Sequence, residues 1–600
     1  MINTKYPTTK PSLNLDFANT KSLDPRITFR RGTPGTYYDG VTHAKAEENL
    51  LKHSENFTDS LWSKLGTSLE TTTEIAPDGS QNAYFLKQNS ANSQHAIYAR
   101  DLADLGKTYS ISIYAKAGAV SRILFASVFT SEHVLYDLSS GEFERYTYSS
   151  KLIKSYNMES VGNGWYRCSI VYESATSDNG IGLYLLDDND EASFVGDNSS
   201  GVYIWGAQLE QRDTVTSYTA TTGAPITKYQ PKLMTAAADH ARFDHDPITG
   251  ESKGLLIEES RTNLLTYSQD FGNAVWGKWN SALIPNTIVA PDGTLTGSKF
   301  TEDGSTWTYH YLRRNANPML SLNTTYTYSV YAKAAERTIM RISMYDGAGF
   351  ADAKFDLSGG TVFSTDLGTA GIESVGNGWY RCYIMGTSNA ANNAQMNFVD
   401  IYTCDDNGSD RYDGDGRSGL YIWGAQLETG SFSTSYIKTT GASATRSADN
   451  ASITGENFSS WYRQDEGSIY CEAAKMNPVT SVIASLNDGT SNNRIFINLR
   501  SGENFEVTKS NNQEVLSGYT GLNAETYYKI AACYKKDSAA MSLGGQNSLS
   551  DTDCEVPGVD RLLFSKNYSS NVLYDYSMYI KKLAYYPQRL TNEQLQNLTK

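Results

Sequence analysis

The feature that most constrains this sequence is an internal repeat. The heptapeptide Gly-Asn-Gly-Trp-Tyr-Arg-Cys at residues 162–168 returns letter for letter at residues 376–382. Other blocks recur at nearly the same spacing, namely Ala-Pro-Asp-Gly at 76–79 and 290–293, and Tyr-Ile-Trp-Gly-Ala-Gln-Leu-Glu at 203–210 and 421–428. The spacing changes only between blocks, as expected when insertions fall in loops. The chain therefore contains two copies of one unit.

The repeat divides the 600 residues into five segments. They are a leader over 1–48, repeat 1 over 49–223, a connector over 224–262, repeat 2 over 263–441 and a last domain over 442–600. A chain of this length predicts several domains rather than one core. The connector has strand-like sequence instead of a Gly/Ser linker, so we expect it to hold the repeats at a fixed angle. The leader is too short for its own core, so we expect it to pack on repeat 1 or to dock on another protein.

Alternation of polar and apolar residues predicts short strands in both repeats. Ile111, Ile113, Ala115 and Ala117 share one side of their strand, and Tyr328, Val330 and Ala332 do the same in the second copy. Gly, Asn and Asp turns separate such segments, a pattern typical of antiparallel sandwiches. We predict an all-β fold of three antiparallel β-sandwich (jelly-roll) domains in series, the first two a tandem repeat. One helix is expected at 590–598, opened by Thr591.

Charge and composition exclude several classes of function. A formal net charge of −15 disfavours nucleic acid and anionic membranes as partners, because both need a basic surface. No apolar run reaches the roughly 18–20 residues that a membrane span needs, and the first residues show no signal peptide. We therefore expect a chain that is made and folded in the cytosol, without membrane insertion. The six cysteines make no disulfide framework, and we expect Cys168 and Cys382 to be small buried thiols.

The candidate ligand-binding site is a polar, aromatic sheet face in each repeat. Alternation places Trp165 and Arg167 on the side of their strand opposite Cys168. If that strand shares a sheet with residues 111–117, one outer face carries Tyr114, Lys116, Trp165 and Arg167, and the second copy gives Tyr331, Lys333, Trp379 and Arg381. Flat rings beside fixed donors suit stacking on sugars. Two other interpretations stay open: Trp stacked on Arg to cover the sheet, or a face that packs on a neighbouring chain.

Two further tryptophans are predicted to lie in the core. Tyr203, Trp205, Ala207 and Leu209 alternate onto one apolar face, and Trp423 occupies the equivalent place in repeat 2.

Two acidic loops are candidates for binding Ca²⁺. Their aspartates are Asp187, Asp188 and Asp190 in repeat 1, and Asp405, Asp406, Asp413 and Asp415 in repeat 2. Clustered carboxylate oxygens suit Ca²⁺, although solvated turns explain the same residues and the spacing is not that of an EF-hand. Nothing else in the sequence requires a cofactor.

Two weaker alternatives involve the connector. His240, Asp244, His245 and Asp246 could suggest a metal site. Glu258 and Glu259 could suggest a catalytic pair, but neighbours on a strand point to opposite faces, and Arg261 is a simpler partner for Glu259.

Several motifs carry a resemblance to known proteins. The connector block Arg-Phe-Asp-His-Asp-Pro with Gly-Leu-Leu-Ile-Glu-Glu, at 242–259, resembles a segment common in tailed-phage and prophage structural proteins, and so do the repeated motifs and the leader at 13–38. The repeats resemble carbohydrate-binding-module-like jelly rolls. The last domain, through its ending at 579–595, resembles concanavalin A-like, laminin-G-type sandwiches. The leader lacks the Arg-Phe-Asp-His-Asp block, so it need not share the connector's role.

This resemblance implies a non-enzymatic virion protein of the tail-fibre, spike or decoration kind that adheres to host-surface glycans. It implies contacts with other virion proteins through the leader and a homo-oligomer, with a trimer favoured, so that weak sites act together. Two alternatives remain. One is a purely architectural capsid or tail decoration without glycan binding. The other is a polysaccharide depolymerase, which a strand with Glu at two-residue spacing in the last domain would support; we find none.

Overall fold

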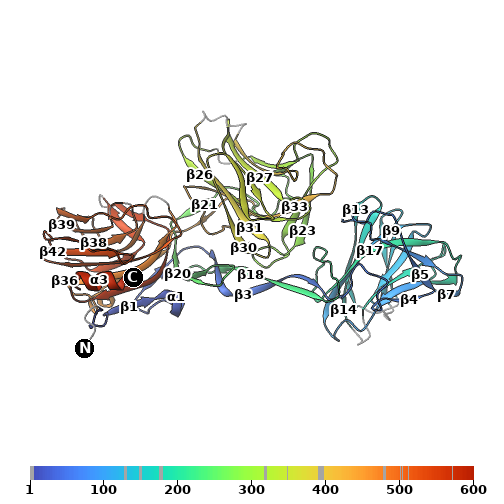
Figure 1. Cartoon of the computed structure of the whole chain (residues 1–600), viewed down its shortest axis with the longest axis horizontal. Coiled ribbons are helices and arrows are strands. Elements are labelled where there is room, and N and C mark those ends of the chain that lie inside the picture. The colour runs from blue at the N-terminus through green and yellow to red at the C-terminus, as the bar shows by residue number, and fades with distance from the viewer. Residues whose placement is uncertain are drawn as a thin grey trace.

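The computed structural model describes residues 6–127, 132–147, 152–174, 180–315, 320–347, 349–389, 397–477, 481–500, 502, 504–510, 512–569 and 572–600. The chain forms three β-sandwiches in an elongated arrangement, with a thin two-stranded ribbon reaching the outermost one (Figure 1). Each sandwich has its own hydrophobic core. The predicted all-β class, with three antiparallel sandwiches, is confirmed.

The two repeats have the same strand order in both of their sheets, which confirms the duplication. Sheet 1 of repeat 1 is, in spatial order, β13 (Ile153–Gly162), β14 (Trp165–Glu173), β9 (Thr108–Ala117), β17 (Gly201–Glu210), β6 (Tyr84–Gln88) and β5 (Thr67–Thr71). Its counterpart in repeat 2 is β30 (Thr369–Gly376), β31 (Trp379–Thr387), β26 (Thr325–Ala334), β33 (Gly419–Thr429), β24 (Gly297–Glu302) and β23 (Ser281–Ile288).

Sheet 2 closes each sandwich from the other side. In repeat 1 it is β12 (Glu142–Thr147), β11 (Glu132–Asp137), β10 (Arg122–Ala126), β15 (Ile181–Leu185), β8 (Ala96–Ala99) and β4 (Ser63–Leu65), with β7 (Asn92–Gln94) and β16 (Ser193–Val195) as a separate pair. In repeat 2 it is β29 (Thr361–Leu367), β28 (Gly349–Asp356), β27 (Ile339–Asp346), β32 (Asn397–Thr403), β25 (Tyr311–Asn315) and β22 (Trp276–Trp279).

The third sandwich is assembled from parts of the chain that are far apart in sequence. One sheet joins β19 (Arg242–His245), β20 (Ser252–Ile257), β47 (Met578–Tyr586), β36 (Glu466–Lys475), β41 (Tyr527–Lys535), β42 (Ser538–Leu543) and β43 (Leu549–Asp551), with β1 (Leu13–Asp16) also paired to β47. The other joins β2 (Thr28–Arg30), β35 (Asn450–Thr454), β44 (Arg561–Phe564), β37 (Val482–Asn487), β38 (Asn493–Asn498), β39 (Phe505–Lys509) and β40 (Asn512–Leu516).

Short elements complete this sandwich. They are the hairpin β45 (Lys566–Ser569) and β46 (Val572–Asp575), and the helices α1 (Phe17–Thr20), α2 (Glu456–Ser459) and α3 (Asn592–Leu598). Helix α3 begins as predicted, because Thr591 caps it and forms a capping box with Gln594.

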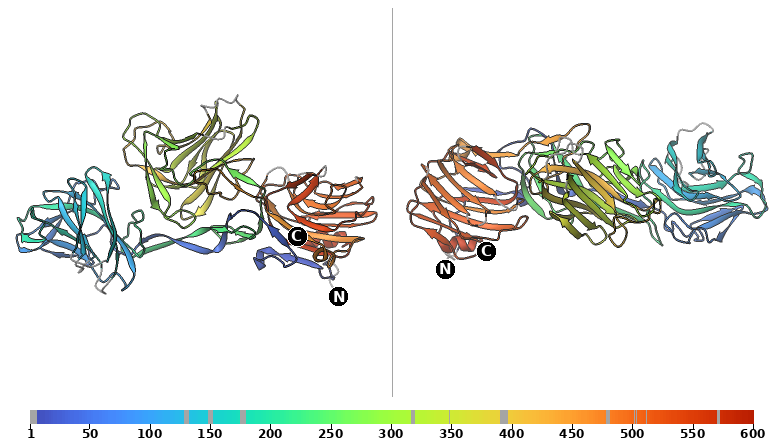
Figure 2. Two further views of the ribbon diagram at one scale, coloured as in Figure 1. Left: turned by 180° about the vertical axis from the view of Figure 1, so that it is seen from behind. Right: turned by 90° about the horizontal axis from the view of Figure 1, so that it is seen from above.

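Most of the leader therefore packs in the third sandwich and only its end, at Lys45 and Glu48, contacts repeat 1, so the expected packing on repeat 1 is wrong for β1 and β2, while docking on another protein stays a prediction. Strand β1 pairs with β47, and β2 pairs with β35, so the leader supplies a strand to each sheet of the third sandwich. The chain then leaves along β3 (Gly35–Asn49), forms repeat 1, and returns along β18 (Ile226–Ala236), which pairs with β3 as the ribbon. It adds β19 and β20, leaves again through β21 (Arg261–Asn263), and returns through β34 (Ala444–Arg446). Both repeats are thus insertions into one sandwich, at which both termini lie (Figure 2).

A buried charge cluster marks the places where the chain leaves and re-enters this sandwich. We call it the root cluster: Arg31, Arg242, Glu258, Arg446 and Asp449. Arg242 binds Glu258 at 2.6 Å and Asp449 at 2.5 Å, and Arg31 binds Asp449 at 3.0 Å. Arg446 lies 3.2 Å from Glu258. Each side chain is at most 1% exposed, so the charges are compensated only by one another and by hydrogen bonds such as that from Ser435 to Glu258.

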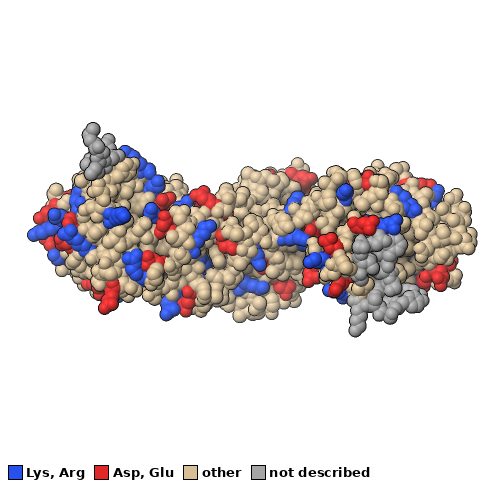
Figure 3. Space-filling view, turned by 90° about the horizontal axis from the view of Figure 1, so that it is seen from below, with Lys and Arg blue, Asp and Glu red and all other residues tan. Residues whose placement is uncertain are grey.

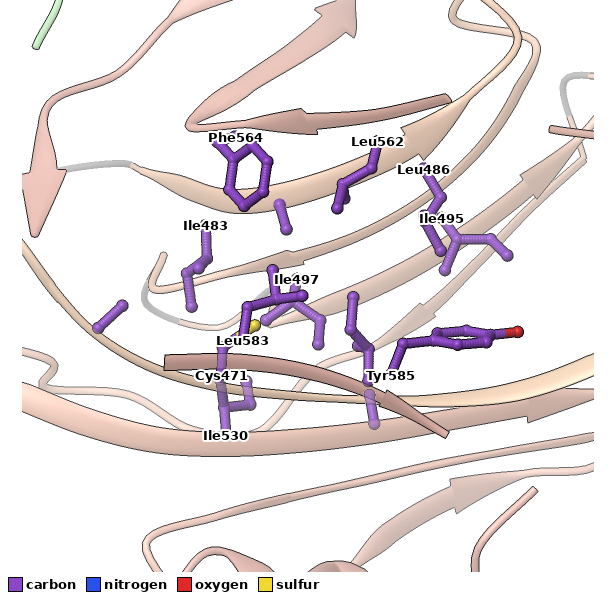
Figure 4. Packing of buried hydrophobic residues seen from close by; sticks show 14 of the residues in the cluster. Cys471, Ile483, Leu486, Ile495, Ile497, Ile530, Leu562, Phe564, Leu583 and Tyr585 are labelled. Carbon is purple, nitrogen blue, oxygen red and sulfur yellow. The ribbon is translucent and has the colours of Figure 1, made fainter. Parts of the chain in front are cut away.

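The core of the third sandwich shows why the distant strands are needed. Leu562 and Phe564 of one sheet face Leu583 and Ile530 of the other across the interior (Figure 4). The leader and connector add seven buried residues to the same core: Leu13, Leu15, Phe17, Ile27, Phe29, Leu255 and Ile257.

A bulge in β17 changes the expected side for Trp205. The pairing of β17 with β9 shifts register between Trp205 and Gln208, where Gly206 has φ +56°. Ala207 and Leu209 consequently lie in the main core, whereas Trp205 lies in a second cluster on the opposite face of the sheet. Trp423 does the same beside Gly424. Both tryptophans are buried, as predicted, but the shared face with Ala207 and Leu209 is wrong.

Candidate functional site

The predicted sugar-binding faces are assembled as expected but are not exposed. Trp165 lies opposite Lys116 and Arg167 opposite Tyr114, and the second copy repeats these pairs with Trp379, Lys333, Arg381 and Tyr331. However, Trp165 is 1% and Trp379 0% exposed. Tyr114, Arg167, Tyr331 and Arg381 are also buried. These residues therefore cannot present an open platform to a glycan.

The chain's own segments cover both faces. In repeat 1, the indole of Trp165 donates to the Ile75 carbonyl at 2.9 Å, and Arg167 packs over the Tyr114 ring at 5.4 Å. In repeat 2, the equivalent contacts are Trp379 to the Val289 carbonyl at 3.1 Å and Arg381 over Tyr331 at 5.5 Å. An arginine thus stacks on a tyrosine to cover each sheet, in place of the stacking of tryptophan on arginine that the sequence left open.

The ribbon adds a second layer over repeat 2. Leu233 of β18 and Tyr38 of β3 pack in the cluster that holds Trp379. Lys333 binds Glu47 of β3 at 2.8 Å, whereas Lys116 of repeat 1 binds the local Glu74 at 2.6 Å. The face of repeat 2 is therefore an internal contact that orients the ribbon.

The acidic loops do not form calcium sites in the described part of the chain, where no three His, Cys, Asp or Glu side chains gather as metal ligands. Their carboxylates instead hold turns together. Asp187 accepts hydrogen bonds from the Glu191 and Asn189 amides, which lower its pKa. Asp190 instead forms an ion pair with Arg122, and Asp406 lies 4.0 Å from Arg337. The remaining carboxylates accept hydrogen bonds from backbone amides: Asp405 from Asn407 and Ser409, Asp413 from Trp307, and Asp415 from Ser418. Asp188 lies in the same turn as Asp187, and because none of these carboxylates belongs to a metal-ligand group in the described residues, the calcium prediction is wrong for them.

The connector residues also have structural roles. Glu259 binds Arg261 at 2.5 Å, as predicted, while Glu258 belongs to the root cluster. Asp244 accepts from the Tyr38 amide at 2.7 Å, and a ring nitrogen of His245 lies 3.1 Å from the Tyr38 carbonyl. These contacts fasten the ribbon to the sandwich.

A row of stacked aromatic rings crosses the outer side of sheet 2 of repeat 2, and its exposure falls along the row from Trp279, which is exposed, through the half-buried Tyr311 to Tyr402, which is 8% exposed. We call Trp279, Tyr311 and Tyr402 the aromatic ridge, because they are register partners on the neighbouring strands β22, β25 and β32. The Trp279 and Tyr311 rings are 5.1 Å apart and 2° from parallel, and those of Tyr311 and Tyr402 are 5.0 Å apart. Trp279 lies on the edge strand and is 41% exposed. Gly277 leaves room for its indole, since a Cβ there would lie 2.3 Å from the ring.

Fixed polar groups lie beside the ridge. Arg313 donates twice to Asp400, at 2.8 and 2.7 Å, and its guanidinium lies 5.1 Å from the Tyr311 ring. Tyr402 donates its hydroxyl to Asp400 at 2.8 Å, and burial followed by the charge of Asp400 raises the pKa of Tyr402, so the hydroxyl keeps its proton. An apolar ring next to held donors and acceptors is the arrangement that sugar recognition requires.

Exposed aromatics extend the ridge toward the loop before β25. Tyr309, 38% exposed, meets Tyr402 edge to face at 6.1 Å, and Trp307 is 67% exposed. Such a concentration of accessible aromatic surface is uncommon unless a ligand or partner uses it.

Repeat 1 lacks this row. The strand pairing places Leu65, Ala96, Tyr184 and Leu124 where repeat 2 has Trp279, Tyr311, Tyr402 and Arg341. Likewise Tyr98 and Gly182 replace Arg313 and Asp400. The copies share a fold but differ in the surface that sheet 2 presents. The signal was in the sequence, because Tyr309, Tyr311 and Arg313 alternate with His310 and Leu312, whereas the aligned stretch of repeat 1 has Gln94, Ala96 and Tyr98 at the alternate positions.

Three further observations bear on other function classes. The face in Figure 3 interleaves acidic and basic side chains without a continuous basic area. Among the described helices, none has the length and apolar character to cross a bilayer. A cavity of about 550 Å³ at one end of the third sandwich carries Glu456 and Asp560, but Asp560 is held by Arg561 at 2.7 Å.

No family model and no curated relative matches the sequence. Among solved structures, the N-terminal CBM22-1-CBM22-2 tandem domain of Xyn10C from Paenibacillus barcinonensis shares 13% identity at a TM-score of 0.19, over 64% of this chain and 99% of that one. Domains LG4-5 of the mouse laminin alpha1 chain share 10% sequence identity at a TM-score of 0.17, and the match covers 49% of this chain and 90% of that one. The LG1-3 region of the laminin alpha2 chain shares 11% sequence identity at a TM-score of 0.18, and the match covers 83% of this chain and 96% of that one. At these TM-scores the likenesses carry no argument, and the β-sandwich assignment rests on the chain's own sheets.

Proposed function

We propose that this chain is a non-enzymatic structural protein of a phage virion, of the fibre, spike or decoration kind, that adheres to host-surface glycans through the aromatic ridge of repeat 2. The observation that carries the glycan part is the stacked row of Trp279, Tyr311 and Tyr402, exposed at its Trp279 end, beside the fixed Arg313–Asp400 pair. The virion part rests on the resemblance of the connector and repeat motifs to tailed-phage proteins. We include in the proposal contacts with other virion proteins and a trimeric assembly, in which one weak site per chain would act by avidity.

A glycan array probed with the purified protein, together with a reducing-sugar release assay on the bound glycans, tests this proposal. Binding without release is the expected result. Release of reducing ends would favour a depolymerase, and the absence of any glycan signal would favour a purely architectural role.

The substitution Trp279→Ala tests whether the ridge is the binding surface. We expect it to weaken glycan binding by about 2 kcal/mol, as for a central aromatic contact, which is roughly thirtyfold in Kd. The melting temperature should barely change, because Trp279 is 41% exposed and belongs to no core cluster. Leu65→Ala, at the matching place in repeat 1, is the control and should leave binding intact. Equal affinities of all three proteins would contradict the assignment.

A further inference from the structure

Trp307 combines two properties that seldom occur together. Its backbone lies in the left-handed region, at φ +49°, where a residue with a Cβ is strained. Among the described non-glycine residues with positive φ, most are Asn or Asp, and Trp307 is the one tryptophan. Its side chain is 67% exposed, so burial of the indole does not offset the strain. A strained conformation that packing does not explain points to a function for the side chain.

The loop around Trp307 is held in this conformation by hydrogen bonds. The Trp307 amide donates to Asp413 Oδ1 at 2.6 Å, and Thr308 and Tyr412 exchange two backbone hydrogen bonds of 3.2 Å. Tyr412 is itself buried, and its hydroxyl donates to Glu302 at 2.7 Å. The backbone that carries the indole is therefore fixed before any ligand arrives, which lowers the entropy cost of binding.

The same loop is tied to the exposed end of the aromatic ridge. Asn280, the residue after Trp279, donates its side-chain amide to the Thr308 hydroxyl and to the Tyr309 carbonyl, both at 3.0 Å. Trp279 and Trp307 thus each adjoin one partner of the same hydrogen bond, which places them within reach of one ligand. The corresponding loop of repeat 1, residues 89–94, is one residue shorter than 303–309 and contains no aromatic residue.

We propose that Trp307 is a second stacking platform of the glycan site, so that the site takes an extended neutral oligosaccharide, with one sugar at Trp279 and another on Trp307. Stacking needs only an apolar ring face on each sugar. The segment 405–416, which meets Trp307 through Asp413, carries five aspartates and one arginine and so disfavours an anionic chain. This inference rests on the proposed function, because it presupposes glycan binding at the ridge.

Isothermal titration of the full chain with the cello-, malto-, manno- and xylo-oligosaccharides of two and six units tests the proposal. We expect the hexasaccharide of at least one series to bind at least tenfold more tightly than its disaccharide. Trp307→Gly should reduce the hexasaccharide affinity to that of the disaccharide and leave the disaccharide affinity unchanged. This variant should melt no lower than the wild type, because glycine adopts the left-handed conformation without strain. Tyr229→Ala, which removes a ring of 62% exposure from the ribbon, should bind both lengths normally.

Two results would overturn the proposal and leave the proposed function standing. One is equal hexasaccharide binding by Trp307→Gly and the wild type, while Trp279→Ala weakens both lengths. The other is a glycan array on which only anionic glycans or single sugars bind. Failure of the proposed function has a different signature, namely no glycan binding at all or disaccharide binding that is unchanged in Trp279→Ala, and the proposal would then fall with it.

Discussion

Arg242→Met is expected to lower the free energy of unfolding by about 3–5 kcal/mol, because it leaves buried carboxylates with too little compensation. Arg242 forms ion pairs with both Glu258 and Asp449, so its loss leaves both buried acids with one cation fewer. Since the cluster joins all the passages between the third sandwich and the repeats, we expect the third sandwich to unfold first. Urea unfolding followed by circular dichroism measures the change.

The same variant should also be more sensitive to acid. Burial alone would raise the pKa of Glu258, but Arg446 and Arg242 lower it to about 2. A carboxylate whose pKa is depressed below its ordinary 4.5 contributes stability above that pH and loses it as the pH falls toward 2. Without Arg242 the pKa of Glu258 rises, so the acid-unfolding midpoint should move to higher pH.

A matched control is available beside Arg31. Arg30 is 70% exposed and lies 3.7 Å from Asp239. Arg30→Met should therefore change stability by no more than about 0.5 kcal/mol, as most surface substitutions do. A similar small loss in Arg242→Met would contradict the role given to the root cluster.

A fragment of residues 442–600 is expected not to fold, although the sequence suggests a complete domain there. It lacks the leader and the connector, which contain β1, β2, β19 and β20, and with them seven residues of the core. Burial of each such side chain is worth about 1.5–3 kcal/mol, and the sum reaches the roughly 5–15 kcal/mol that stabilises a typical domain.

The control keeps the third sandwich and removes the insertions. Gly35 pairs with Ala236, and Asn263 pairs with Ala444, so each insertion begins and ends on adjacent strands. A chain with residues 36–235 and 264–443 each replaced by a two-residue turn should fold cooperatively. In NMR spectra, we expect well-dispersed amide resonances from this shortened chain and poorly dispersed amide resonances from the fragment 442–600. A cooperative transition in 442–600 alone would refute the interwoven fold.

Local sequence patterns identified the strands and the duplication because both are short-range properties. Alternation placed Ile111, Ile113 and Cys168 in the core correctly, since side chains of a strand take turns on its two faces. The same rule failed at Trp205, where the bulge at Gly206 reverses the alternation. A glycine inside a strand pattern is a known sign of a bulge, so this error was avoidable.

The rest depended on contacts between distant segments. Nothing near Trp379 indicates that Tyr38 and Leu233 will cover it, because the ribbon that brings them there is formed by strands from opposite ends of repeat 1. Nor does the leader's alternation say that β1 pairs with β47 at the far end of the chain. An exposed face can be inferred from a strand pattern only when nothing else in the chain is built to cover it.

Binding stoichiometry tests the central claim most directly. We expect isothermal titration of the whole chain with a neutral glycan identified on the array to give one site per chain, because among the described residues it is repeat 2 that carries the stacked row of Trp279, Tyr311 and Tyr402 with its exposed Trp279 end. That site should disappear in Trp279→Ala. Two equivalent sites per chain, retained in Trp279→Ala, would show that both repeats bind through a surface that they share, and would contradict the account.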